Sequence, residues 1–180
     1  MKTTKIANKF LSIRALLTDV DGVLTDGGII YDNNQNEWKR FNAKDGLIVK
    51  PLQSMGFVVG AITGRESGAV ARRLHELGLD TYFQGSQQKT AHYETIKARF
   101  GLRDEQIAYI GDDLNDLPVL MQCGLSACPA DAVAEVRARV DWVLEVAGGQ
   151  GAFRAFAERI LAEQGRIPEL LAMYQPLPPL

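Results

Sequence analysis

Residues 14–26 read RALLTDVDGVLTD, and this stretch decides the fold class of the chain. A short apolar run that ends in an acidic residue is typical of a buried strand. The run closes with Asp19, and a second acid, Asp21, follows two positions later. In sheets of parallel strands, ligands bind just outside the carboxyl ends of the strands. We therefore expect the chemistry of this protein to begin where this strand ends.

Outward from this strand, apolar runs of strand length alternate with segments of helical periodicity. The pattern predicts further strands at 57–63, 81–83, 107–111, 125–128 and 142–144. It predicts helices at 45–55, 66–77, 88–100, 115–123, 132–139 and 152–164. Such alternation indicates an α/β fold with a doubly wound, mostly parallel sheet that helices cover on both faces.

Two local features modify this pattern. The polar turn DNNQN at 32–36 lies between the strand-like segments 27–31 and 37–41, which predicts a β-hairpin inserted after the first strand. Pro51 lies inside the helix predicted at 45–55. Proline lacks a backbone N–H and clashes with the preceding turn, so we expect a kink there.

The length of 180 residues fits one domain, 1–180. A formal net charge of −2 gives no basic surface for nucleic acid or an anionic membrane, so neither is expected as a partner. No apolar run reaches the roughly 18 residues of a membrane span, and none has signal-peptide character, so we expect a cytoplasmic protein. Cys123 and Cys128 are best interpreted as core residues rather than as a metal or redox pair.

Polar residues follow four of the predicted strands. They are Asp19 and Asp21, Thr63–Arg65, Lys89, and Asp112–Asp113 with Asn115 and Asp116. Asp19 and Asp112 offer the hard oxygen ligands that Mg²⁺ prefers. A carboxylate such as Asp19 can attack phosphorus, and Asp21 can protonate the leaving alcohol and then activate water. Thr63 and Lys89 can hold the phosphoryl oxygens, so the set predicts phosphoryl transfer.

Two other functions place acids after strands. Acids often cap helices, but two acidic clusters, a threonine and a lysine at successive strand ends are more than caps require. A receiver-type signalling domain also gathers acids, a threonine and a lysine around a magnesium-bound aspartyl phosphate, but its acidic pair comes first in the chain. Here Asp19 and Asp21 come first and the acidic pair at 112–113 comes last. This order favours a phosphatase over a signalling domain.

Four motifs resemble those of the haloacid dehalogenase superfamily, in the order typical of that family. They are DVDGVLTD (19–26), TGR (63–65), Lys89 and GDDLND (111–116). The resemblance implies that Asp19 is the nucleophile and Asp21 the acid and base, and that Thr63 and Lys89 bind the phosphate. It also implies that Asp19, the carbonyl of Asp21 and Asp112 hold Mg²⁺, while Asp113 and Asp116 orient the last acidic loop.

The spacing of these motifs leaves no room for a cap domain. Thr63 follows Asp19 by 63 − 19 = 44 positions, and Lys89 follows Thr63 by 89 − 63 = 26. Both intervals are shorter than the roughly 50 residues of a small domain. We expect a site without a lid, in which the hairpin, about 26–42, forms a flap.

FNAKDG (41–46) and GGQGAFR (148–154) resemble segments of the capless branch of that superfamily. Phosphatases of that branch act on 3-deoxy-D-manno-octulosonate 8-phosphate, in lipopolysaccharide precursor synthesis, or on nonulosonate 9-phosphates. The resemblance implies a homotetramer joined through the hairpins, with the tail, about 165–180, of one subunit over the site of its neighbour.

The same resemblance assigns substrate contacts. They are Asn42, Ala43, Lys44, Asp45, Gly46, Lys50, Arg65 and Arg73. The planar guanidinium of an arginine matches the carboxylate of a sugar acid. Nonulosonate enzymes tend to carry an acid where this chain has Arg65, which favours the octulosonate, although the segment 31–42 is similar to the nonulosonate relatives.

Overall fold

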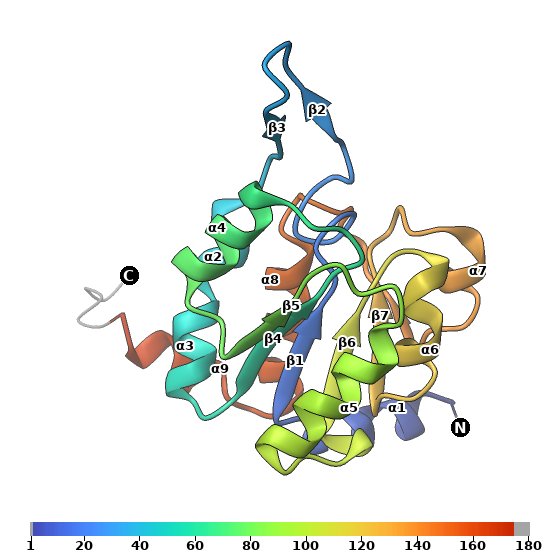
Figure 1. The fold of residues 1–180 in the computed structure, drawn as a ribbon. Helices are drawn as coiled ribbons and strands as arrows, with labels where there is room; N and C mark the ends of the chain where they lie inside the picture. The colour runs from blue at the N-terminus through green and yellow to red at the C-terminus, as the bar shows by residue number, and fades with distance from the viewer. Residues whose placement is uncertain (1, 175–180) are drawn as a thin grey trace.

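A computed structural model describes residues 2–174 of the chain and contains a six-stranded sheet of order β5-β4-β1-β6-β7-β8 (Figure 1). All neighbouring strands are parallel. Their bounds are β1 Ala15–Thr18, β4 Val58–Ile62, β5 Thr81–Phe83, β6 Ile107–Ile110, β7 Leu125–Cys128 and β8 Trp142–Val143. The predicted α/β fold is confirmed, and the opening stretch provides β1, which lies between β4 and β6.

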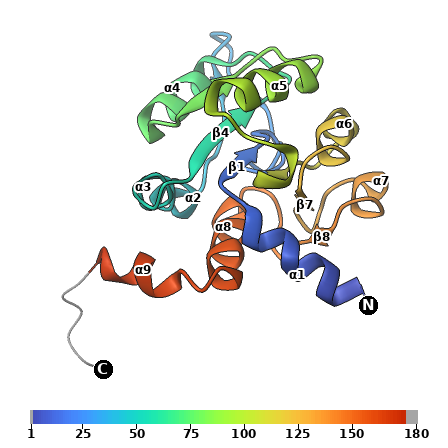
Figure 2. The same cartoon turned by 90° about the horizontal axis from the view of Figure 1, so that it is seen from below.

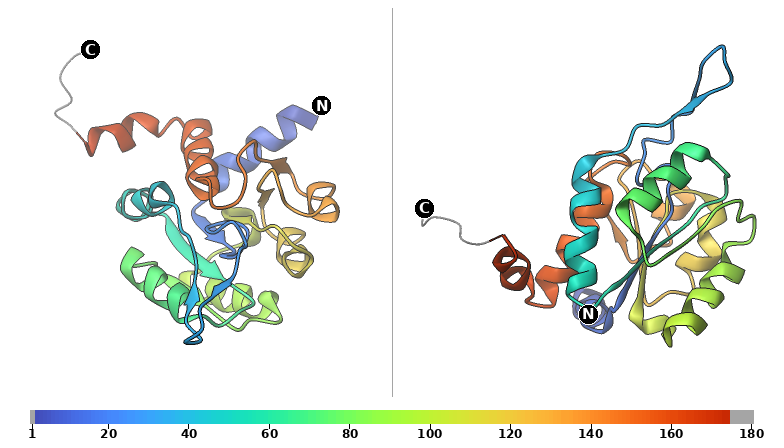
Figure 3. Two further views of the ribbon diagram at one scale, coloured as in Figure 1. Left: turned by 90° about the horizontal axis from the view of Figure 1, so that it is seen from above. Right: turned by 60° about the vertical axis from the view of Figure 1, so that its left-hand side comes forward.

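Helices cover both faces of the sheet (Figures 2 and 3). Their bounds are α1 Lys2–Ser12, α2 Ala43–Leu47, α3 Val49–Ser54, α4 Gly68–Leu77, α5 Lys89–Phe100, α6 Leu117–Leu120, α7 Ala134–Arg137, α8 Ala152–Glu163 and α9 Ile167–Ala172. Successive strand residues point to opposite faces, so Leu16 packs in the core that α8 covers, whereas Leu17 packs with Tyr93 and Ile96 of α5. Every residue of β1 is buried, as expected for a strand covered on both sides.

The helix predicted at 45–55 is divided into α2 and α3, which meet at Ile48. Pro51 therefore lies in the first turn of α3, where its missing N–H would have no intrahelical partner in any case. The predicted kink is a full break three residues before the proline.

The two ends of the chain hold helices that the periodicity did not predict. α1 lies beside α8, and an ion pair joins Lys9 to Asp141 at 2.6 Å. α9 occupies the first part of the expected tail, 165–180. The tip of that tail, residues 175–180, lies outside the described residues.

The predicted hairpin is confirmed and projects beyond the sheet as β2 (Ile30–Tyr31) and β3 (Glu37–Trp38) (Figure 1). It lies at the same side of the molecule as the carboxyl ends of the strands (Figure 3). Between β1 and β4, the chain forms only this hairpin, α2 and α3, so no cap domain is inserted there. Across residues 2–174, no helix has the length and apolar character needed to span a membrane.

Candidate active site

Four of the residues expected at strand ends meet at one edge of the sheet. Asp19 directly follows β1, Thr63 directly follows β4, and Asp112 lies two positions after β6. Because β1 pairs in parallel with both β4 and β6, these three strand ends are adjacent. Lys89 is the first residue of α5 and reaches the same place from the loop after β5.

The ammonium group of Lys89 joins two carboxylates in the interior. Its Nζ lies 2.9 Å from Asp19 Oδ1 and 2.7 Å from Asp116 Oδ1, and its side chain has no solvent exposure. Burial opposes the charge of Lys89, but the carboxylates of Asp19 and Asp116 outweigh burial, so the pKa of Lys89 lies above its ordinary value. Lys89 therefore stays charged beside the expected nucleophile.

Asp19 and Asp112 form the acidic part of the site. Burial, reinforced by neighbouring carboxylates, raises the pKa of both residues. Carboxylate oxygens of Asp19, Asp112 and Asp116 lie within 4.8 Å of one another, and Asp112 Oδ1 is buried without a hydrogen-bond partner among the described residues. Oxygens so placed fit a hard divalent cation, whose charge would reverse both pKa shifts.

Asp116 belongs to this cluster by distance but not by availability. Its Oδ1 accepts hydrogen bonds from Lys89 Nζ and Tyr109 OH, and its Oδ2 accepts from the backbone N–H groups of Asp112 and Asp113. With both oxygens occupied, Asp116 holds the loop at 112–113 rather than a metal. Asp113 is exposed, and its carboxylate caps the short 3-10 turn at Leu114–Asp116.

Gly22 lets the loop after β1 approach Asp112. It has φ +90°, and a Cβ atom at this position would lie 2.0 Å from Asp112 Oδ2. Only glycine avoids both the backbone strain and the steric clash. The glycine after the Asp-x-Asp pair is therefore required for the two acidic segments to meet.

Asp21 has a partner that the sequence analysis missed. The Nζ of Lys39, which follows β3 in the hairpin, bonds Asp21 Oδ1 and lies 3.7 Å from Glu37 Oε1. No sequence motif marks Lys39, since only the folding of the hairpin over the site brings it to Asp21.

A cavity of about 170 Å³ opens between these groups. It is lined by Asp19, Asp21, Thr63, Gly64, Arg65, Asp112, Asp113 and Asn115. Arg65 is partly engaged by the hairpin, because its Nη2 donates to Tyr31 OH at 3.1 Å and to Glu37 Oε2 at 3.3 Å. Asn115 was noted in the sequence as part of the last motif but without a role.

Five of the expected substrate contacts, 42–46, lie beside the cavity lining rather than in it. Asn42 caps α2 and donates to Gly149 O at 3.3 Å, and Asp45 accepts from Arg154 N at 2.7 Å. A Cβ on Gly46 would lie 2.5 Å from Arg73 Nη2, so Arg73 belongs to the same cluster. Ala43 and Lys44 are exposed in the first turn of α2.

Lys50 is the expected substrate contact that the structure does not bring to this place. Its Nζ lies 3.4 Å from the carbonyl of Gly78, at the carboxyl end of α4. That end of α4 leads into the start of β5, so the ammonium group points toward the opposite edge of the sheet. A lysine in the first turn of α3 cannot face the strand ends while the helix packs as it does.

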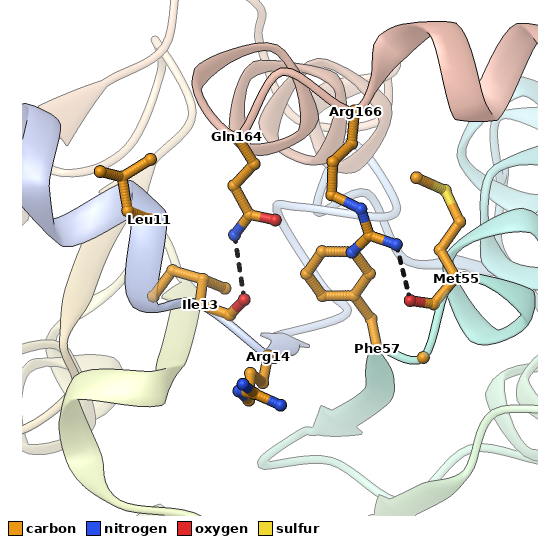
Figure 4. A pocket seen from close by; sticks show the side chains of 8 residues that line it. Leu11, Ile13, Arg14, Met55, Phe57, Gln164 and Arg166 are labelled. Atoms are coloured by element: carbon orange, nitrogen blue, oxygen red, sulfur yellow. Dashed lines mark hydrogen bonds between the residues drawn. The ribbon is translucent and has the colours of Figure 1, made fainter.

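A second cavity, of about 300 Å³, lies at that opposite edge (Figure 4). Its lining residues are Leu11, Ile13, Arg14, Met55, Gly56, Phe57, Gln164 and Arg166. Arg166 pairs with Glu169 and donates to Met55 O, and Gln164 donates to Ile13 O. Since these groups bond within the protein, the smaller cavity at the strand ends is the better candidate site.

Comparisons with known proteins point to one group. A family model described as haloacid dehalogenase-like hydrolase matches residues 42–124. The 3-deoxy-D-manno-octulosonate 8-phosphate phosphatase KdsC of Haemophilus influenzae is 43% identical over 159 residues, 88% of this chain and 88% of that protein.

Two solved structures illustrate the similarity in three dimensions. A HAD superfamily (subfamily III A) hydrolase from Legionella pneumophila has a TM-score of 0.92 at 38% identity, over 96% of this chain and 95% of that one. The 3-deoxy-D-manno-octulosonate 8-phosphate phosphatase of Moraxella catarrhalis, in complex with magnesium, phosphate and KDO, has a TM-score of 0.91 at 35% identity, over 96% and 99%. The similarity therefore covers the fold and the strand ends that carry the site.

Proposed function

The chain belongs to the haloacid dehalogenase-like hydrolase family, and we propose that it hydrolyses 3-deoxy-D-manno-octulosonate 8-phosphate to the free sugar acid and phosphate. This reaction would serve lipopolysaccharide precursor synthesis. The observation that carries the proposal is the meeting of Asp19, Lys89 and Asp112 around one small cavity at the strand ends.

In this proposal, Asp19 is the nucleophile. Its carboxylate attacks phosphorus and forms an aspartyl phosphate, while Asp21 protonates the leaving sugar oxygen. Asp21 then takes a proton from the water that hydrolyses the intermediate. Lys89, held charged between Asp19 and Asp116, neutralises the phosphoryl oxygens together with the hydroxyl of Thr63.

We propose Mg²⁺ as the cofactor, with Asp19, Asp112 and the carbonyl of Asp21 as its protein ligands. The unpartnered, buried Asp112 Oδ1 supports this assignment, and so does the bound magnesium of the Moraxella catarrhalis phosphatase. When bound, the ion supplies neutralisation of negative charge on the transferring phosphoryl group. Asp116 and Asp113 orient the loop that carries Asp112.

For the sugar acid, we propose Arg65 and the cluster of 42–46 with Arg73 as the binding residues. A nonulosonate 9-phosphate is the alternative substrate. The names of the relatives favour the octulosonate, because the phosphatases of Haemophilus influenzae and Moraxella catarrhalis both act on its 8-phosphate.

We also propose that residues 1–180 form one domain that assembles into a homotetramer through the hairpins. Supporting this, the hairpin carries the exposed side chains of Ile30, Tyr31 and Trp38. Exposed apolar clusters of this kind are typical of interfaces. The unpaired cysteines, both buried and free, are consistent with a cytoplasmic location.

The test is phosphate release from both sugar-acid phosphates with saturating Mg²⁺. We expect kcat/KM for the octulosonate 8-phosphate to exceed that for a nonulosonate 9-phosphate by about tenfold or more. Asp19→Asn should abolish release from both substrates and leave the circular dichroism spectrum unchanged. Undiminished turnover by that variant contradicts the nucleophile, whereas a reversed preference contradicts only the substrate.

A further inference from the structure

We propose that Lys39 is a positioning residue for the acid–base step. With Thr25, it holds one carboxylate oxygen of Asp21 and leaves the other oxygen to carry the proton. The inference rests on the proposed function, since Asp21 has an acid–base role only in that reaction.

The first observation is the burial of Lys39 on an exposed hairpin. Its neighbours face solvent, with Trp38 59% exposed and the Arg40 side chain 71% exposed, whereas the Lys39 side chain is 0% exposed. A buried ammonium group is unfavourable unless it is paired. Asp21 is the closest of its acidic partners, because Glu37 Oε1 lies 3.7 Å from the ammonium nitrogen. The hairpin thus places a desolvated cation against the expected acid–base residue.

The second observation is that the two oxygens of Asp21 differ. Oδ1 accepts hydrogen bonds from Lys39 Nζ and from Thr25 Oγ1, the latter at 3.3 Å. Oδ2 is buried and has no hydrogen-bond partner among the described residues. A buried carboxylate oxygen ordinarily finds a donor within the protein. Oδ2 is therefore the oxygen available to exchange a proton with substrate and water.

The proton movements follow from this difference. In the first half-reaction, an Asp19 oxygen bonds to phosphorus as the phosphorus–ester oxygen bond breaks. The released electron pair stays on the ester oxygen, which takes the proton from Asp21 Oδ2. In the second half, a water oxygen bonds to phosphorus as the Asp19 oxygen–phosphorus bond breaks, and Oδ2 takes the proton of that water. Lys39 holds Oδ1 in both halves without changing its own protonation.

The test uses the different need of two leaving groups for a proton. p-Nitrophenolate leaves as a stable anion, whereas the alkoxide of glycerol phosphate must be protonated as it leaves. For Lys39→Met, we expect kcat/KM to fall about 30- to 100-fold for glycerol phosphate and less than about threefold for p-nitrophenyl phosphate. This parameter covers only the steps up to formation of the aspartyl phosphate, so the hydrolysis half does not enter.

Three further variants make the test specific. Lys39→Arg keeps the charge and should restore kcat/KM for glycerol phosphate to within about tenfold of the wild type. Thr25→Val removes the second hydrogen bond to Oδ1 and should give a smaller loss in the same direction, which keeps the test alive where Lys39→Met does not fold. Arg40→Met is the matched control, because this exposed neighbour pairs with Asp26 at 2.6 Å, and neither substrate should be affected.

A double-mutant cycle separates an action through Asp21 from a direct one. In the Asp21→Asn background, Lys39→Met should cause little further loss. Equal losses on both substrates, no loss on either, or full additivity with Asp21→Asn each overturns the proposal. Mg²⁺ titrations of every variant ensure that all rates are compared at metal saturation. Failure of the wild-type protein to hydrolyse either ester would instead overturn the proposed function itself.

Discussion

Asp45 is the residue whose ionisation works against the folded state. It is 3% exposed, and burial raises its pKa to about 6, although the Arg154 N–H donates to its Oδ1. The folded protein thus holds this proton more tightly than the unfolded chain does. Stability from this group is present below about pH 4 and is lost as the pH rises through about 6.

Asp45→Asn should therefore be more stable than the wild type at about pH 8, by about 1–3 kcal/mol. The stability difference should disappear near pH 4, where the carboxyl group is neutral in both states. Urea unfolding of both proteins at the two pH values measures this. A constant difference at both pH values would show that Asp45 ionises normally. Lower activity of the stabler variant would support its proposed contact with substrate.

The sequence identified Asp45 as a site residue through its motif, but not as a buried one. Its burial depends on the start of α8, which lies more than 100 positions away along the chain. The same limit applies to Lys39 and Lys50. The sequence carried no signal for the contact of Lys39 with Asp21, and it could not show that Lys50 faces the other edge.

Among the elements, the loop before α8 supports the loop that follows β1. Gly149 N donates to Val23 O at 2.9 Å, and a Cβ on Gly148 would lie 2.0 Å from Gly22 O. The two backbones are thus in direct contact, with no space for a side chain between them. The glycines of the segment 148–154 therefore shape the loop that carries the nucleophile and the acid.

Gly148→Ala should push these loops apart. We expect a loss of stability of about 1–3 kcal/mol and a fall in kcat of at least about tenfold, since small displacements at a reacting centre are costly. Thermal melting and steady-state kinetics measure the two effects. Gly68→Ala is the matched control, because a Cβ there meets nothing within 4 Å at the start of α4, and stability and rate should hold. Equal behaviour of the two variants would contradict the supporting role of Gly148.

For the whole molecule, the metal links folding to proton uptake. Burial and neighbouring carboxylates raise the pKa of Asp19 to about 7 and that of Asp112 to about 8, so metal binding must displace protons. Mg²⁺ affinity should therefore increase as the pH rises from about 6 to about 8. Because the unfolded chain has no assembled site, Mg²⁺ at 100 times Kd should add about 2.7 kcal/mol of stability.

Thermal melts with a Mg²⁺ titration at both pH values check this linkage. EDTA should return the melting temperature to its metal-free value. Asp112→Asn removes one proposed ligand and should abolish most of the Mg²⁺-dependent shift while the metal-free fold persists. An equal shift in that variant would exclude Asp112 from the metal site.

Assembly is the second property at this scale. Trp38 is 59% exposed on the projecting hairpin, which we propose as the tetramer contact. Trp38→Glu should shift the sedimentation mass from four chains toward one, because a buried charge opposes association. Met121→Glu, at a side chain 65% exposed on the end of α6, is the control and should leave the mass unchanged. A monomeric wild-type protein, or a tetrameric Trp38→Glu, contradicts the proposed contact.

The sequence by itself determined the alternation of strands and helices, the hairpin and the four motifs of the site. Each of these is encoded in a few consecutive residues, through apolar periodicity, turn residues and acids that follow strands. The tertiary structure alone decided that β1 lies between β4 and β6, that Lys39 reaches Asp21, and that Lys50 faces away. Those features depend on contacts between residues distant in the chain, and such contacts form only when the elements pack around a common core.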